Sequence, residues 1–401
     1  MDKILQKLES DLSSKLLDIR SISYKRFFFN ELLAELKYVD TITMLKGLRG
    51  VGKTTLILQL VDFLLKQRKK VLYFSADNII FDQTKIYDFV EYLYKHEYEY
   101  VFIDEIHLYK NCAQELKNIC DDFKIKVVVT GSNGLKLQRA KYDLSRRASI
   151  YELPVLSYRE YLSIKEGKNQ KVLDFNVLLK NYKELSLKQR VFPLDIYWSK
   201  GALPFFWKQD DKKYYETVKN ILDKLIFEDL LTYNFTSETI LKSKKVLLYL
   251  AQNPPSEVNS NSIASSSELS RDTVLSLLEA FKDMGIIREI ISTKKGKNLL
   301  KENKKYLLVP PFRSILCRLS LKDPNLGALR EDFFINHTFN LYPQYFGDTK
   351  SPDYLIKENI FEIGGNYKNK KQIFDYKSSY VVKDTGFSQD SIPLYLFGYL
   401  Y

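Results

Sequence analysis

The sequence predicts an α/β fold, in which a doubly wound parallel sheet is followed by a helical middle part and a small α/β C-terminal domain. Apolar runs that alternate with helical segments through residues 42–155 predict the parallel sheet. A glycine-rich turn at residues 47–54 joins the first strand to a helix, and polar or acidic residues follow three later strands. At 401 residues, the chain is long enough for two or three domains.

The composition excludes wholesale disorder, because hydrophobic residues make up 45% of the chain and charged residues 28%. No apolar run approaches the roughly 18 residues that span a membrane. The charged, amphipathic start differs from a secretory signal. We therefore expect a cytoplasmic protein. The net charge of +12 weakly favours polyanionic partners.

The cysteines and histidines show no metal or disulfide pattern. The cysteines are odd in number and lack the paired C-x-x-C spacing of zinc sites. The histidines are scattered, and we interpret them as ordinary surface or core residues. We therefore expect neither a zinc site nor a disulfide framework. These residues are Cys112, Cys120, Cys317, His96, His107 and His337.

The glycine-rich turn has the Walker A spacing G-x-x-x-x-G-K-[ST], between an apolar strand at 42–45 and a helix at 56–67. Two earlier segments, 3–19 and 26–36, carry apolar residues at helical spacing and are expected to be packing helices. Backbone N–H groups of such a turn wrap a polyphosphate, and the helix N-terminus favours anionic charge. We expect ATP to bind here, with Lys53 neutralising the β- and γ-phosphates. The expected binding residues are Gly47, Leu48, Arg49, Gly50, Val51, Gly52, Lys53, Thr54 and Thr55.

Two of the later strands end in acidic residues. The strand at 71–74 is followed by Asp77, which either lies near the nucleotide or caps the next helix. The next strand ends in Asp104 and Glu105, a pair typical of a Walker B motif. Asp104 would hold Mg²⁺ together with Thr54, and Glu105 would orient or deprotonate the attacking water.

The strand at 127–133 ends in small polar residues, of which Thr130 or Ser132 would contact the γ-phosphate. A Leu-Ser-Arg-Arg segment then ends at Arg147. An arginine at a domain edge can stabilise the transition-state charge, in its own chain or from a neighbouring subunit. It can also form only a surface or interdomain salt bridge, and both alternatives stay open.

Together these motifs resemble the predicted AAA+ superfamily ATPases that carry a C-terminal DUF4143 region. The resemblance rests on Gly-Leu-Arg-Gly-Val-Gly-Lys-Thr-Thr, Val-Phe-Ile-Asp-Glu-Ile, Val-Thr-Gly-Ser and Leu-Ser-Arg-Arg, followed by Leu-Pro-Val-Leu-Ser-Tyr-Arg-Glu-Tyr-Leu. In that family the arginine segment usually reads Leu-x-Gly-Arg. Here Arg146 replaces the glycine, and Arg147 matches the family arginine. The resemblance covers essentially the whole chain and implies magnesium-dependent ATP hydrolysis.

Residues 241–320 are expected to form a winged-helix-like domain after a helical adapter at 166–240. Three helices, the third capped by Ser270, precede two strands of a wing. The wing is rich in lysine, which suits contacts with DNA phosphates, whereas the third helix is nearly balanced in charge. DNA binding and an adapter that packs on the ATPase core or on a partner both stay open. The wing lysines are Lys294, Lys295, Lys297, Lys301, Lys304 and Lys305.

Residues 321–401 are similar in order to a PD-(D/E)xK nuclease core. In such a core, Asp and Glu hold a metal, and a lysine two residues after the Glu assists attack on the phosphodiester. Asp353 and Glu362 fit the acidic positions, but Gly364 occupies the lysine position and Lys368 lies outside the spacing. We therefore expect a degenerate, vestigial nuclease site used for interaction.

The sequence thus predicts a phosphate-loop ATPase domain at 1–165, followed by the three regions named above. We expect ATP and Mg²⁺ as ligands, and hydrolysis that drives or switches a conformational change in a complex. One alternative is a nucleotide-switched module that binds DNA or protein with little turnover. A metal-dependent nuclease is the third. An unidentified protein partner and a homo-oligomer are compatible with these hypotheses.

Overall fold

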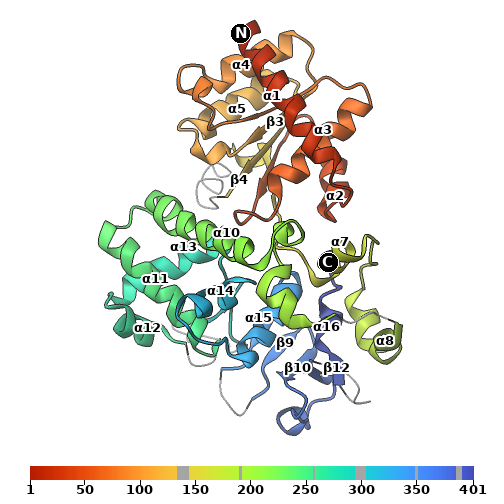
Figure 1. Ribbon diagram of the computed structural model, residues 1–401, viewed down its shortest axis with the longest axis vertical. Helices are drawn as coiled ribbons and strands as arrows, with labels where there is room; N and C mark the ends of the chain where they lie inside the picture. Colours follow the sequence, from red (N-terminus) through yellow and green to blue (C-terminus); the bar gives the residue numbers. More distant parts are fainter. Residues whose placement is uncertain (133–143, 189–191, 256–257, 294–303, 348–350, 385–390) are drawn as a thin grey trace. The chain divides into compact units, whose positions relative to one another are not determined.

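The computed structural model divides into two compact units, the first unit (residues 1–154) and the second unit (155–401) (Figure 1). The first unit ends before the boundary expected at residue 165, so helix α7 (Tyr158–Glu166) belongs to the second unit. The structure describes residues 1–132, 144–188, 192–255, 258–293, 304–347, 351–384 and 391–401. Within these ranges, no helix has the length and apolar character that a membrane crossing requires.

The first unit is built on a five-stranded sheet in the order β2-β3-β4-β1-β5. All neighbouring strands run parallel, which confirms the predicted parallel sheet. Strand β4 lies between β1 and β3, so the C-terminal ends of these three strands are adjacent. The strands are β1 (Ile42–Lys46), β2 (Val71–Ser75), β3 (Tyr100–Asp104), β4 (Lys126–Gly131) and β5 (Ala148–Glu152).

Helices cover both faces of this sheet. Figure 1 shows α4 and α5 on one side of the sheet, and α1, α2 and α3 on the other. Helix α1 buries an aliphatic stripe and packs against α3 and β2, as the helical spacing of its apolar residues predicts. The helices are α1 (Asp2–Arg20), α2 (Phe28–Glu35), α3 (Lys53–Lys66), α4 (Ile86–Lys95) and α5 (Cys112–Asp122), with short turns η1 (Ile79–Asp82), η2 (Ile106–Leu108) and η3 (Ser145–Arg147).

The middle part of the second unit contains three helices and a hairpin. Helices α11, α12 and α13 precede strands β6 and β7, the order expected for residues 241–320, and their assignment as a winged helix stays a prediction. The N–H of Thr273 donates to the hydroxyl group of Ser270 at 3.1 Å, which confirms the predicted cap of α13. The elements from residue 175 on are α8 (Phe175–Lys188), α9 (Leu194–Ile196), α10 (Asp211–Lys224), α11 (Ser237–Gln252), α12 (Ser260–Ser267), α13 (Arg271–Asp283), β6 (Ile287–Ile290) and β7 (Lys305–Leu308).

A second five-stranded sheet, in the order β12-β11-β10-β9-β8, forms the C-terminal part of this unit. Strands β10, β11 and β12 run parallel, whereas β9 and β8 continue the sheet in antiparallel pairs. The elements are α14 (Phe312–Leu319), α15 (Leu326–Thr338), β8 (Gln344–Tyr345), β9 (Tyr354–Ile356), β10 (Asn359–Gly364), β11 (Ser379–Lys383), β12 (Ser391–Pro393) and α16 (Leu394–Phe397).

A buried ion pair connects three helices of the second unit. Arg313 of α14 and Asp332 of α15 are both 2% exposed, and the Nε atom lies 2.5 Å from Oδ2. The guanidinium group also donates to the backbone oxygens of Leu250 and Ala251 in α11, at 2.8 Å each. These bonds offset the desolvation cost of burying both charges, so loss of either partner would leave an uncompensated charge.

A buried histidine joins α7 to α15. The Nε2 atom of His337 accepts the N–H of Tyr158 at 3.0 Å, and its Nδ1 atom lies 2.8 Å from the carbonyl oxygen of Phe333. Nε2 therefore carries no proton, and Nδ1 donates to Phe333. Complete burial lowers the pKa of His337 from 6.5 to about 4. The imidazole is consequently neutral at physiological pH.

Acid is expected to destabilise the second unit through His337. The unfolded chain binds a proton at this residue below pH 6.5, whereas the folded chain binds it only near pH 4. The stabilising contribution is therefore complete above the unfolded pKa and is lost as the pH falls through the folded one, by about 3 kcal/mol. Urea unfolding at neutral and acidic pH should show a smaller acid loss in His337→Gln than in the wild type.

Tryptophan fluorescence is a suitable probe for this experiment, because both tryptophans, Trp198 and Trp207, lie in the second unit. His96→Gln is the control, since His96 is an exposed histidine of the first unit. This control should lose as much stability in acid as the wild type. Equal acid losses in His337→Gln and the wild type would contradict the assigned role.

Candidate functional site

The turn after β1 has a backbone that requires glycine at three positions. Gly50 and Gly52 have φ angles of 83° and 97°, in the left-handed region that side chains rarely adopt. At Gly47, a Cβ atom would lie 2.5 Å from the backbone oxygen of Leu153. The glycines of the Walker A spacing therefore allow a tight loop that ends on the first turn of α3.

Lys53 is the first residue of α3 and folds back over this loop. Its side chain is buried, and its amino group donates to the backbone oxygens of Gly47 at 2.8 Å and Leu48 at 3.1 Å. A positive charge and a helix N-terminus thus lie on the same loop. This combination favours an anionic group such as a phosphate.

The carboxylate of Asp104 is the centre of the polar network at the C-terminal edge of the sheet. Its Oδ2 atom accepts the hydroxyl group of Thr54 at 2.7 Å, and its Oδ1 atom accepts the hydroxyl group of Thr130. The N–H of Glu105 lies 3.2 Å from the same Oδ1 atom and 3.3 Å from the Thr130 oxygen. The structure therefore brings together Thr54, Asp104, Glu105 and Thr130, which come from the C-terminal ends of the adjacent strands β3 and β4 and from the first turn of α3.

The donor set at Asp104 fits magnesium. Mg²⁺ prefers hard oxygen ligands and commonly takes one or two from the protein, with water and substrate phosphates completing its shell. The Thr54 hydroxyl and the Asp104 carboxylate are such oxygens, and they lie beside the phosphate loop. Among the described residues, no group of three or more His, Cys, Asp or Glu side chains is arranged to hold a metal.

His107 takes part in this site, although its sequence context predicts an ordinary histidine. It is 1% exposed, its Nε2 atom lies 3.1 Å from Ser132 Oγ, and its Nδ1 atom lies 3.2 Å from Glu105 Oε2. Ser132 and Glu105 are thereby connected through one imidazole. Glu105 also has a φ angle of 51°, which is uncommon for a residue other than glycine. The position of His107, three residues after Asp104, was the available sequence signal.

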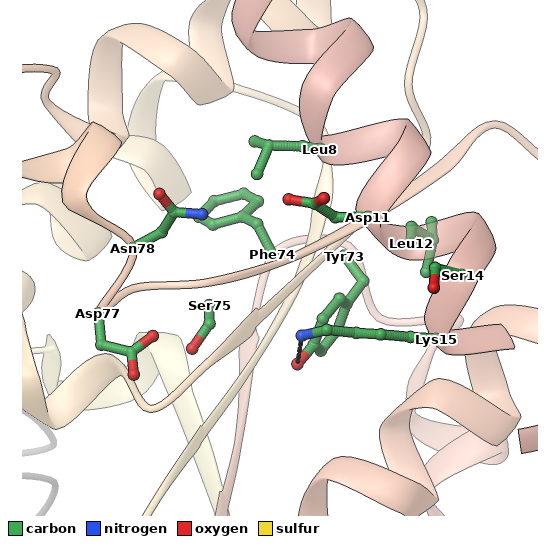
Figure 2. A pocket seen from close by; sticks show the side chains of 10 residues that line it. All are labelled: Leu8, Asp11, Leu12, Ser14, Lys15, Tyr73, Phe74, Ser75, Asp77 and Asn78. Atoms are coloured by element: carbon green, nitrogen blue, oxygen red, sulfur yellow. Dashed lines mark hydrogen bonds between the residues drawn. The ribbon is translucent and has the colours of Figure 1, made fainter. Parts of the chain in front are cut away.

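Tyr73 of β2 is a second residue that the sequence analysis did not select. Its hydroxyl group donates to Asp104 Oδ2 at 3.0 Å. Burial, followed by the neighbouring Asp104 carboxylate, raises the pKa of Tyr73 above its usual value, so the phenol keeps its proton. A cavity of about 340 Å³ lies beside Tyr73 (Figure 2). Asp77 lines this cavity, and the cap of the following turn is Asn78, which accepts the N–H of Ile80 at 3.1 Å.

Arg147 forms a salt bridge, which is one of the two roles that the sequence left open for it. Its Nε atom lies 2.5 Å from Oδ1 of Asp121 in α5, and both side chains are partly exposed. This contact is within the first unit. A catalytic role of Arg147 therefore requires that it leave Asp121, and this role stays a prediction.

Arg26 is a third residue of this site that the sequence does not single out. Its guanidinium group is buried and donates to the backbone oxygens of Val51 at 2.8 Å and Pro154 at 2.9 Å. Val51 belongs to the phosphate loop, and Pro154 is the last residue of the first unit. The amide of Gln59 in α3 donates to the backbone oxygen of Tyr24 at 2.9 Å, which fixes the segment before Arg26. Arg26 therefore anchors the phosphate loop through the backbone of Val51.

The wing lysines do not all suit phosphate contacts. Lys305 is 7% exposed and its amino group lies 2.5 Å from Glu331, so its expected role as an exposed phosphate contact is wrong. Lys304 lies 3.0 Å from Glu289. Lys294, Lys295, Lys297 and Lys301 lie outside the residues that the structure describes.

The carboxylates of the two C-terminal acids, Asp353 and Glu362, each accept a backbone N–H group of the other segment. Ile363 N–H donates to Asp353 Oδ2 at 2.7 Å, and Asp353 N–H donates to Glu362 Oε2 at 3.2 Å. Lys368 forms an ion pair with Glu362, and a Cβ atom at Gly364 would lie 2.8 Å from the Lys368 side chain. Lys368 thus occupies the space above Gly364 despite its different sequence spacing. Burial, then Glu331 and Glu362, raise the pKa of Asp353 to about 7.

Replacement of Arg26 should destabilise the first unit. Arg26→Met removes the charged donors to two backbone oxygens, which we expect to lower the free energy of unfolding by about 2–3 kcal/mol. Chemical denaturation followed by circular dichroism would measure this change. Arg20→Met is the matched control, because Arg20 is 49% exposed and its partner Asp62, at 2.8 Å, keeps a second ion pair with Lys66 at 2.6 Å. Similar, small losses in both variants would show that Arg26 does not anchor the loop.

Comparison with known proteins supports the interpretation of the first unit. Residues 39–162 match the family model described as AAA domain, and residues 193–319 match a domain of unknown function (DUF8612). The chain is similar to the uncharacterized protein MJ1637 of Methanocaldococcus jannaschii, with 29% identity over 392 residues, 87% of this chain and 82% of that protein. It is also similar to an uncharacterized protein of Haemophilus influenzae, with 25% identity over 294 residues and 69% of each chain.

Among solved structures, AMPPCP-bound DnaA from Aquifex aeolicus aligns with a TM-score of 0.29 and 15% identity, over 65% of this chain and 90% of that chain. The model that matches the second unit differs from the DUF4143 region named from the sequence, so that resemblance stays a prediction. The AAA domain match spans all five strands of the parallel sheet and the glycine-rich loop. It therefore supports a nucleotide-binding P-loop ATPase domain of the AAA type in the first unit.

Proposed function

We propose that the protein is a magnesium-dependent ATPase whose hydrolysis drives or switches a conformational change in a larger complex. The observation that carries the proposal is the convergence on Asp104 of hydroxyl groups from the phosphate loop helix and from β4. A metal-binding pair, a γ-phosphate contact and Glu105 thereby share one edge of the sheet. The AAA domain match over the same residues supports this assignment.

Nucleotide binding is assigned to the loop at residues 47–55. Its backbone N–H groups would surround the phosphates, and Lys53 would neutralise the β- and γ-phosphate charge. Thr54 and Asp104 would hold magnesium between them. Magnesium bound there would supply positive charge that neutralises the phosphate oxygens.

The hydrolytic step is assigned to Glu105, which would orient or deprotonate the attacking water. Thr130 or Ser132, at the adjacent end of β4, would contact the γ-phosphate. Arg147, after leaving Asp121, would stabilise the transition-state charge in its own chain or in a neighbouring subunit.

A second candidate is a nucleotide-dependent switch with low turnover that binds a protein or DNA partner. The 3.2 Å contact between the Glu105 carboxylate and His107 Nδ1 favours it, because a carboxylate engaged by His107 must be released before it can orient water. In this version, the nucleotide state of the site, and not the rate of hydrolysis, controls the partner. The turnover number distinguishes the two candidates.

Glu105→Gln should lower steady-state ATP hydrolysis by about 100-fold or more, because it removes the assigned base while keeping the shape of the side chain. ATP affinity, measured with a fluorescent analogue, should remain close to that of the wild type. Glu97→Gln is the control, since Glu97 is exposed and forms a surface ion pair with Lys70 at 3.0 Å. Unchanged hydrolysis in Glu105→Gln would disprove the assigned role.

Alanine variants of Arg147 and of its partner Asp121 distinguish a catalytic arginine from a structural ion pair. If Arg147 stabilises the transition state, Arg147→Ala should reduce kcat by about 1,000-fold, the lower end for such arginines, whereas Asp121→Ala should not. If the ion pair is only structural, both variants should change the free energy of unfolding by less than about 1 kcal/mol, and kcat should equal that of the wild type in both. Steady-state kinetics on both variants, and the oligomeric state with a non-hydrolysable ATP analogue, measure the difference.

A further inference from the structure

The carboxylate of Asp104 has one donor that the proposed reaction does not use. Tyr73 is 3% exposed, and its hydroxyl group donates to Asp104 Oδ2 at 3.0 Å. The same oxygen accepts the hydroxyl group of Thr54 at 2.7 Å. Oδ2 thus accepts one hydrogen bond from Thr54, a proposed metal ligand, and one from Tyr73, which has no proposed role in binding the metal. Tyr73 is therefore placed to fix the carboxylate from the side away from the phosphate loop.

Tyr73 is itself held by the N-terminal helix. The amino group of Lys15 in α1 donates to the Tyr73 hydroxyl oxygen at 3.3 Å and lies 4.7 Å from the centre of the ring. Figure 2 shows Lys15 reaching from α1 to this oxygen at the wall of the cavity. The ammonium group donates to the phenol, and the phenol donates to the carboxylate. The three groups thus form one chain of hydrogen bonds, in which each donor points toward Asp104.

We infer that Tyr73, held by Lys15, is a positioning residue that sets the magnesium affinity of the Thr54–Asp104 pair. Partners that orient a metal-binding carboxylate typically change metal affinity by 10- to 100-fold when they are removed. The inference rests on the proposed function, because it requires that magnesium bind with nucleotide at this pair. It adds that α1 takes part in the metal site through Tyr73, although no side chain of α1 is hydrogen-bonded to Asp104 within the described residues.

The test measures the magnesium dependence of nucleotide binding in the full chain. A fluorescent, non-hydrolysable ATP analogue is titrated at increasing Mg²⁺ concentration with the wild type and with Tyr73→Phe, which keeps the ring and removes the hydroxyl group. The Mg²⁺ concentration at half-saturation should rise about tenfold. The analogue affinity at saturating Mg²⁺ should stay at the wild-type value. Lys15→Met should shift the Mg²⁺ dependence in the same direction by a smaller factor.

Tyr98→Phe is the matched control. Tyr98 also donates its hydroxyl group to a carboxylate of α1, Glu9, at 2.6 Å, but it has no bond to Asp104. This variant should keep the wild-type Mg²⁺ dependence. In parallel, excess Mg²⁺ should restore the ATP hydrolysis rate of Tyr73→Phe.

Three results would overturn the inference. These are equal Mg²⁺ half-saturation in Tyr73→Phe and the wild type, an equal shift in Tyr98→Phe, and a loss in Tyr73→Phe that excess Mg²⁺ does not restore. A wild type whose analogue binding and hydrolysis do not depend on Mg²⁺ would instead refute the proposed function, and this inference with it. The wild-type titration therefore tells the two failures apart.

Discussion

The buried carboxylate of Asp104 is the interaction on which the nucleotide site depends. It is 3% exposed, and a charge so removed from water is tolerated only where hydrogen-bond donors replace the solvent. The structure supplies three hydroxyl groups, from Tyr73 on β2, Thr130 on β4 and Thr54 at the start of α3. Because β3 lies between β2 and β4, the strand order places one donor on each side of the acid, Tyr73 on β2 and Thr130 on β4.

Much of this arrangement could be predicted from the sequence. Short apolar runs and helical spacing gave the strands and helices of the first unit, and the rule that parallel strands end at one edge placed Thr130 beside Asp104. Arg26 and Tyr73 could not be found in this way, because they act on partners that no sequence spacing connects with them. For example, Arg26 reaches Pro154 across 128 positions of the chain.

In the second unit, sequence spacing was misleading where side-chain length and turns determine the contacts. Lys368 lies outside the motif spacing, yet its side chain passes over Gly364 and its amino group pairs with Glu362. Lys305 seemed to belong to an exposed wing, but the fold buries it against Glu331. A long, flexible lysine side chain can reach a carboxylate from many backbone positions, so its partner is decided by tertiary structure.

The position of the boundary between the two units also has a physical reason. Leu153 N–H donates to the backbone oxygen of Lys46 at 2.8 Å, which continues the pairing beside β1, and the oxygen of Pro154 is bound by Arg26. Two residues after Pro154, the backbone hydrogen bonds are made within the second unit, since Leu156 N–H donates to the oxygen of Ala202 at 2.8 Å. The phosphate loop and the end of the first unit therefore share one anchor, Arg26, whose second bond goes to Val51 of that loop.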